Sequence, residues 1–220
     1  MIDSLYLAWQ YICFNKVKTI ILVASITLIA VLPLTLEVLL AESERQLLSR
    51  AQSTPLLIGA KGSSLDLAMN SLYFDDEALE LLTMEAVERV EDTGLALPIP
   101  LYVRFQAGGF PVIGTSFDYF DFRKLTMAKG HPLTMLGDCV LGAKVASQLG
   151  LAPGDNLVTS PENLFDLAGV YPLKMKVVGV LASNHSADDL AIFVDLKTAW
   201  VIQGLGHGHE DVTRTRDSSV

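Results

Sequence analysis

The 220-residue sequence contains only two cysteines, Cys13 and Cys139, so it carries no disulfide framework. It also lacks the Walker A pattern, the G-x-S-x-G nucleophile elbow, the HExxH pair and the CxxC pair. Without a Walker A loop the chain does not hydrolyse ATP, and the sequence groups no nucleophile with a base and an orienting residue. We therefore expect a protein that is not an enzyme and has no catalytic or cofactor-binding residues.

Positive charge is scarce as well. The chain has 16 Lys and Arg residues against 25 Asp and Glu residues, which gives a net charge of −9. Residues 1–41 are neutral, so the whole negative charge belongs to residues 42–220. An acidic domain repels phosphate backbones, which argues against nucleic acid as a partner.

The sequence has one long uncharged run, at residues 19–36. As a helix it is about 27 Å long, and about 35 Å when extended to Ala41, which suits a hydrocarbon core of about 30 Å. We predict a transmembrane helix at 19–41, a cytoplasmic or interfacial segment at 1–18 and an extracytoplasmic domain at 42–220.

The flanks of this run predict its orientation. Lys16 and Lys18 precede it, and the positive side of a span stays in the cytoplasm, so the N-terminus is expected inside. A cleaved signal peptide is the alternative. The run is longer than a signal-peptide core, and Leu39 stands where cleavage after Ala41 needs a small residue, so we favour retention.

Apolar residues at helical spacing also precede the run. They fit a cytoplasmic extension of the span, which we favour, or a separate elbow helix that touches a cytoplasmic partner. The residues are Leu5, Ala8, Trp9, Ile12 and Cys13.

Helical and strand patterns are interspersed in residues 42–220, which predicts an α+β fold with a mixed α/β domain of βαβ-like units. The helix leaving the membrane is expected to end before Pro55, and Cys139 is expected to be a small core residue. Further helices are predicted at 64–74, 84–92, 143–149 and 197–205, and strands at 55–62, 95–105, 110–117, 139–142, 156–160, 171–181 and 190–196.

Several short motifs occur in a fixed order along residues 1–203. They are Leu5-x-x-Ala8-Trp9-x-Tyr11, Asn15-Lys16-x-Lys18-Thr19, Val112-Ile113-Gly114, Asp118-Tyr119-Phe120, Gly130, Leu141-Gly142-Ala143-Lys144-Val145-Ala146, Leu149-Gly150-Leu151-x-Pro153-Gly154-Asp155 and Val177-Val178-Gly179-Val180. In this order the chain resembles the N-terminal part of the MacB and FtsX-like family of ABC transporter permeases, in which a first transmembrane helix leads into a MacB-like periplasmic core domain. Physically the motifs support folding: Gly142 and Gly150 bracket a helix, and Asp155 caps a turn.

The resemblance implies a permease subunit in the bacterial cytoplasmic (inner) membrane. A separate cytoplasmic ABC ATPase subunit would bind and hydrolyse ATP, a second permease copy or paralogue would complete a dimer, and membrane lipid would surround the span. The family continues into three more transmembrane helices that this sequence lacks, so we interpret the domain as incomplete at its C-terminus. The alternative is a single-pass, membrane-anchored binding protein without transport activity.

One cluster resembles a metal site. His207, His209 and Glu210 offer imidazole and carboxylate ligands, and His185 with Asp188 and Asp189 could lie nearby. A His-x-His pair on a glycine-rich loop has no fixed third ligand, so we interpret it as a solvated loop and assign no metal site.

Overall fold

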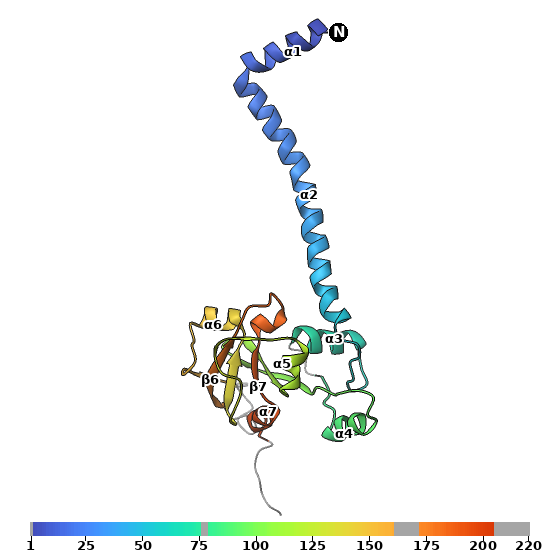
Figure 1. Ribbon diagram of the computed structural model, residues 1–220, viewed down its shortest axis with the longest axis vertical. Helices are drawn as coiled ribbons and strands as arrows, with labels where there is room; N and C mark the ends of the chain where they lie inside the picture. Colours follow the sequence, from blue (N-terminus) through green and yellow to red (C-terminus); the bar gives the residue numbers. More distant parts are fainter. Residues whose placement is uncertain (1, 76–78, 161–171, 205–220) are drawn as a thin grey trace, which may run out of the picture. The chain divides into compact units, whose positions relative to one another are not determined.

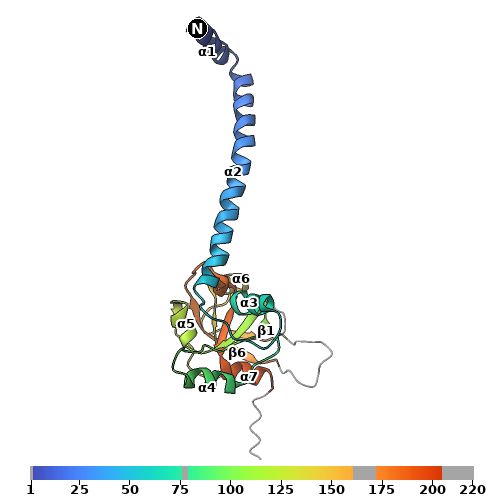
Figure 2. The same cartoon turned by 90° about the vertical axis from the view of Figure 1, so that its right-hand side faces the viewer.

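The computed structural model describes residues 2–75, 79–160 and 172–204. The chain divides into two compact units, Met1–Pro55 and Leu56–Val220, which are drawn in two views in Figures 1 and 2.

The first unit consists of helices α1 (Ile2–Phe14) and α2 (Lys16–Gln52). The chain leaves the helical conformation at Asn15, with φ −100° and ψ 52°, so α1 is a helix of its own. The residues before the span therefore form a separate helix and do not continue α2, while their cytoplasmic location stays a prediction. The cause is local, because Asn competes with helical geometry through its own side chain; here its side-chain amide donates to the carbonyl of Tyr11.

Helix α2 is apolar and exposed along most of its length, with Ile20 through Leu40 facing outward. Within the described residues it is the one helix that is long and apolar enough to cross a membrane. Its 37 residues correspond to about 55 Å. The helix runs through Pro33 and ends at Gln52, shortly before Pro55, as the sequence predicted.

The second unit is built on a mixed seven-stranded sheet, which confirms the α+β fold. The strand order is β1-β2-β7-β4-β6-β3, and β5 also pairs with β6. The β2/β7 and β4/β6 pairs are parallel, and the other pairs are antiparallel. The strands are β1 (Leu101–Ala107), β2 (Phe110–Thr115), β3 (Met127–Gly130), β4 (Asp138–Leu141), β5 (Asn156–Val158), β6 (Lys174–Leu181) and β7 (Ile192–Asp195).

Short helices surround this sheet. Two hydrophobic clusters form the core, one joining the sheet to α6 and α7, the other gathering Phe74, Tyr119 and Phe193 with strand residues on the opposite face. The helices are α3 (Ser64–Tyr73), α4 (Met84–Asp92), α5 (Asp118–Phe122), α6 (Ala143–Leu149), the 3₁₀ helix η1 (Ala187–Leu190) and α7 (Leu196–Ile202).

The motif-bearing turns take the predicted roles. Gly150 ends α6 in the left-handed conformation with φ 66°, which glycine adopts without steric cost. The Asp155 carboxylate accepts a hydrogen bond of 2.8 Å from the Ala152 N–H and so caps the turn at Pro153–Gly154. Cys139 is fully buried in the core, as expected.

One predicted strand is absent from the structure. Residues 55–62 contain no strand, and Leu56 and Ile58 are 70% and 55% exposed. Gly59 instead lies against helix α3, where an added Cβ would meet Leu67 Cδ1 at 2.4 Å. The apolar run therefore follows a helix surface and pairs with no strand.

The outer edge of β6 is satisfied along its whole length. Strand β5 covers its first half and β3 its second half. Between them, the Gly154 N–H donates to the Val177 carbonyl, the Val177 N–H donates to the Asp155 carbonyl, and the His131 N–H donates to the Val178 carbonyl. Turns thus complete the pairing that no single strand provides.

Gly142, which directly precedes α6, lies in close contact with the backbone of η1. An added Cβ would lie 2.3 Å from the Asp188 carbonyl oxygen and 2.5 Å from that of Asp189, both backbone atoms. We expect Gly142→Ala to lower the free energy of unfolding by about 1–3 kcal/mol, through overpacking. Urea unfolding followed by Trp200 fluorescence in a Trp9→Phe background measures it. Gly62→Ala, with nothing within 4 Å of the added Cβ, is the matched control and should change stability by about 0.5 kcal/mol or less; equal effects would contradict the packing argument.

Candidate functional site

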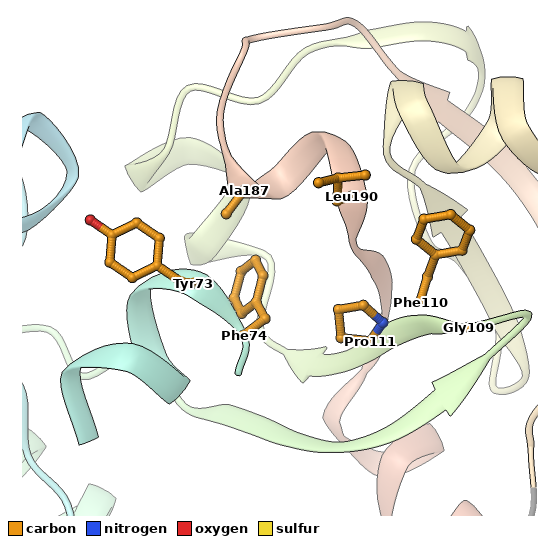
Figure 3. A pocket seen from close by; sticks show the side chains of 7 residues that line it. All are labelled: Tyr73, Phe74, Gly109, Phe110, Pro111, Ala187 and Leu190. Carbon is orange, nitrogen blue, oxygen red and sulfur yellow. The ribbon is translucent and has the colours of Figure 1, made fainter. Parts of the chain in front are cut away.

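An apolar cavity of about 310 Å³ opens at one end of the sheet. Three segments that are distant in sequence meet there: the end of α3, the turn between β1 and β2, and η1 (Figure 3). Aromatic and aliphatic side chains dominate its lining, and the Tyr73 hydroxyl is the one polar side-chain group among them. The lining residues are Tyr73, Phe74, Gly109, Phe110, Pro111, Ala187 and Leu190.

Phe74 joins this cavity to the core. It is 4% exposed and its ring meets the Phe193 ring edge-on, with centroids 6.2 Å apart. Its backbone is left-handed, with φ 61°, a conformation that costs a non-glycine residue roughly 1–2 kcal/mol. Burial of the ring offsets this cost and holds the end of α3 against the sheet.

The opposite wall is fixed by Asp189, which is 1% exposed. One carboxylate oxygen accepts the Asn184 N–H at 3.0 Å, and the other accepts the His185 N–H at 3.0 Å and the Ser183 hydroxyl at 2.7 Å. Three hydrogen bonds to a buried carboxylate make a rigid turn. These hydrogen bonds therefore fix the conformation of the loop that leads into η1.

Asp188, also 1% exposed, connects the same loop to the neighbouring elements. Its Oδ1 accepts a hydrogen bond of 2.7 Å from the Tyr119 hydroxyl on α5, and its Oδ2 accepts one of 2.8 Å from Ser186. The Tyr119 ring packs against Phe193, with centroids 5.6 Å apart. The hydrogen bond between Tyr119 and Asp188 thus links the cavity wall to the aromatic core.

The residues that resemble a metal site in the sequence fall into two groups. His207, His209 and Glu210 lie outside the described residues. Asp188 and Asp189 serve the loop through hydrogen bonds, and among the described residues no three His, Cys, Asp or Glu side chains are grouped to hold a metal ion. That the chain has no metal site therefore stays a prediction.

The cavity was not predicted from the sequence. The signal that was available is local: Gly108 and Gly109 form a tight hairpin turn followed directly by Phe110 and Pro111, which places an aromatic side chain at the tip. That α3 and η1 meet this tip depends on long-range pairing. The arrangement can hold an apolar group, and its seven lining residues include no carboxylate, imidazole or thiol.

A second organised turn lies at the other end of the sheet, before β4. The Asp138 Oδ2 atom accepts hydrogen bonds from the Met135 N–H (2.8 Å), the Thr134 hydroxyl (2.9 Å) and the Thr134 N–H (3.1 Å). Burial raises the pKa of this carboxyl, but the hydrogen bonds from Met135 and Thr134 together with the His131 charge outweigh it and hold the pKa below its usual value. The adjacent Cys139 has its pKa raised to about 12, by burial and by the Asp138 charge.

Comparisons with known proteins place these features in a family context. The family model described as MacB-like periplasmic core domain matches residues 20–217. No curated protein sequence matches the chain.

Solved structures with a similar arrangement include two extracytoplasmic domains. The extracellular domain of the noncanonic ABC-type transporter YknZ from Gram-positive bacteria has a TM-score of 0.44 and 16% identity, over 56% of this chain and 67% of that chain. The periplasmic region of MacB from Actinobacillus actinomycetemcomitans has a TM-score of 0.42 and 16% identity, over 56% of this chain and 59% of that chain. The family match and the candidate transmembrane helix together indicate a membrane-anchored extracytoplasmic domain.

The lowered pKa of Asp138 gives a pH prediction. Because the folded state binds the proton less tightly, the carboxylate stabilises the fold above the unfolded pKa of about 3.9, and this stabilisation is lost as pH falls through the folded value. Asp138→Asn should lower the free energy of unfolding by about 1–3 kcal/mol at neutral pH, with the difference shrinking below about pH 4. Urea titrations across pH measure it, with Asp92→Asn at an exposed position as control. A difference independent of pH would contradict the assignment.

Proposed function

We propose that this chain, which belongs to the MacB-like periplasmic core domain family, is the permease subunit that couples cytoplasmic ATP hydrolysis to movement of its extracytoplasmic domain. A separate ABC ATPase supplies the hydrolysis, and ATP is its cofactor. The subunit works as a dimer with a second copy or a paralogue, in the lipid of the bacterial cytoplasmic membrane, with its N-terminus inside.

The observation that carries this proposal is the continuity of α2. About 55 Å of helix exceeds the bilayer core by about 25 Å, so one uninterrupted element serves both as the span and as the connection leading to Pro55. A helix transmits displacement along its axis without a hinge, whereas a loop absorbs it. This property favours mechanical coupling over simple anchoring.

The sites favour coupling over chemistry as well. The cavity offers apolar contact, and the buried carboxylates of Asp188 and Asp189 are engaged in fold-defining hydrogen bonds. A subunit that moves a bound partner or cargo needs a rigid domain, and these internal bonds supply rigidity. The apolar lining suits a hydrophobic group on that cargo.

The first test is made on the full-length gene product. After gentle solubilisation it should copurify with an ABC ATPase, and ATP should change hydrogen exchange in residues 56–204 of the reconstituted complex. Ser43→Pro, which interrupts α2 beyond the membrane at a cost of about 3 kcal/mol, should keep the ATPase bound but abolish the ATP-dependent change. Ser43→Ala should behave like the wild type. Clean purification without an ATPase would sink the permease assignment and favour the single-pass binding protein.

The second test addresses orientation and uses the natural cysteines. Cys13 is exposed, while Cys139 is buried and its pKa is raised to about 12, so it stays an unreactive thiol. A membrane-impermeant maleimide should label Cys13 in inverted vesicles and leave it unlabelled in intact spheroplasts. A Cys13→Ser, Ser147→Cys variant, with the new thiol at an exposed site in α6, should show the reverse pattern. Labelling of Cys13 from outside would overturn the N-terminus-inside topology.

A further inference from the structure

A surface we call the basic tip lies at the end of the sheet opposite the apolar cavity. Its apolar part is the turn before β4, where Met135 and Leu136 are 75% and 60% exposed. The turn is rigid because Asp138 accepts three hydrogen bonds from Thr134 and Met135, and because the Gly137 N–H donates to the buried Thr198 hydroxyl at 3.1 Å. The buried carboxylate fixes the backbone of a turn that exposes two large apolar side chains to water. Such an arrangement indicates a preorganised contact surface.

Three lysines lie next to this turn through sequence or backbone pairing. The Lys176 N–H donates to the Gly137 carbonyl at 2.9 Å, Lys174 lies two residues earlier on the same strand, and Lys197 precedes Thr198. All three are exposed. The carboxylates next to them in sequence or register are those of Asp138, Asp155 and Asp195, and each accepts backbone N–H groups. The basic tip is Met135, Leu136, Lys174, Lys176 and Lys197.

Helix α4 has the complementary character. None of its residues is buried, although one face is apolar. The exposed face carries four carboxylates. Exposed leucines flank the helix: Leu81 and Leu82 precede it at 45% and 46% exposure, and Leu95 and Leu97 follow it at 90% and 69%. We call residues 80–97 the α4 segment; its acidic side chains are Glu80, Glu85, Glu88, Glu91 and Asp92.

We propose that the α4 segment of a second copy of this chain docks on the basic tip. Charge complementarity selects the occupant: the chain is acidic, its exposed acidic helix combines carboxylates with leucines, and the tip combines lysines with Met135 and Leu136. Arg89 is the one basic residue within α4, so docking on the basic tip adds positive charge beside its acidic face.

The topology allows the pairing to be reciprocal. Strand β1 begins where β2 ends, beside the end of β7 and the start of β4, and the chain enters β1 from α4. Both views draw α4 and α7 at this same end of the domain (Figures 1 and 2). A two-fold axis beside it therefore lets each copy give its α4 segment and receive the other's. The inference rests on the proposed function in one respect, that the permease is a dimer, and it names the dimer's extracytoplasmic contact.

Disulfide trapping between two tagged copies tests the contact directly. Full-length chains in a Cys13→Ser background are co-expressed, one copy with Leu136→Cys and the other, differently tagged, with Glu88→Cys, both exposed positions. Oxidation should give a dimer that carries both tags. Ser147→Cys in place of Leu136→Cys is the matched control, on α6 away from the tip, and should give none.

Charge reversal separates the contact from a folding effect. Lys174→Glu with Lys176→Glu on the Leu136→Cys copy should lower the trapped fraction about tenfold. Glu88 is occupied by the probe, so Glu85→Lys with Glu91→Lys on the other copy should restore it, whereas Lys144→Glu on α6 should have no effect. Loss without restoration, or a trapped adduct with any other protein instead of the second tag, would overturn the proposal.

The two proposals fail independently. If an ABC ATPase copurifies but no two-tag dimer is trapped, the α4 contact is wrong and the permease assignment stands. If the two-tag dimer is trapped and no ATPase copurifies, the contact stands and the permease assignment fails.

Discussion

The segment between β6 and β7 depends on two adjacent carboxylates that are withdrawn from water yet keep their hydrogen bonds. Asp189 organises the loop, and Asp188 connects it to Tyr119 on α5. The same segment passes so close to Gly142 that no side chain fits between them. Buried polar groups are costly when unpaired and rigidifying when paired. Because β7 lies between β2 and β4, the centre of the sheet is placed by the loop that these carboxylates hold.

The sequence allows the elements near strong local signals to be predicted. The apolar run of α2, the hairpin at Gly108–Gly109 and the helix between Gly142 and Gly150 each follow from a pattern that acts over a few residues. The break at Asn15 was missed because one residue outweighs a helical pattern on both sides of it. The short elements α5, β3 and η1 were missed for a related reason, since so few residues show no period.

The candidate sites follow from long-range pairing, which a single sequence does not display. Insertion of β7 between β2 and β4 brings η1 to the hairpin tip and so creates the cavity. Asp188 and Asp189, read in the sequence beside a histidine, suggested ligands; in the fold they are the internal supports of a loop. Residue type alone cannot separate these roles, because both need carboxylate oxygens held in place.

The completed outer edge of β6 has a consequence for how the folded domain meets other chains. An uncovered strand edge is a template on which a second chain can add by backbone pairing. Here two short strands and the turns at Gly154 and His131 use up the donors and acceptors that such an addition requires. Anchored proteins are confined to two dimensions and meet each other often, so covering the eight-residue edge of β6 removes one long template on which two copies could pair by their backbones.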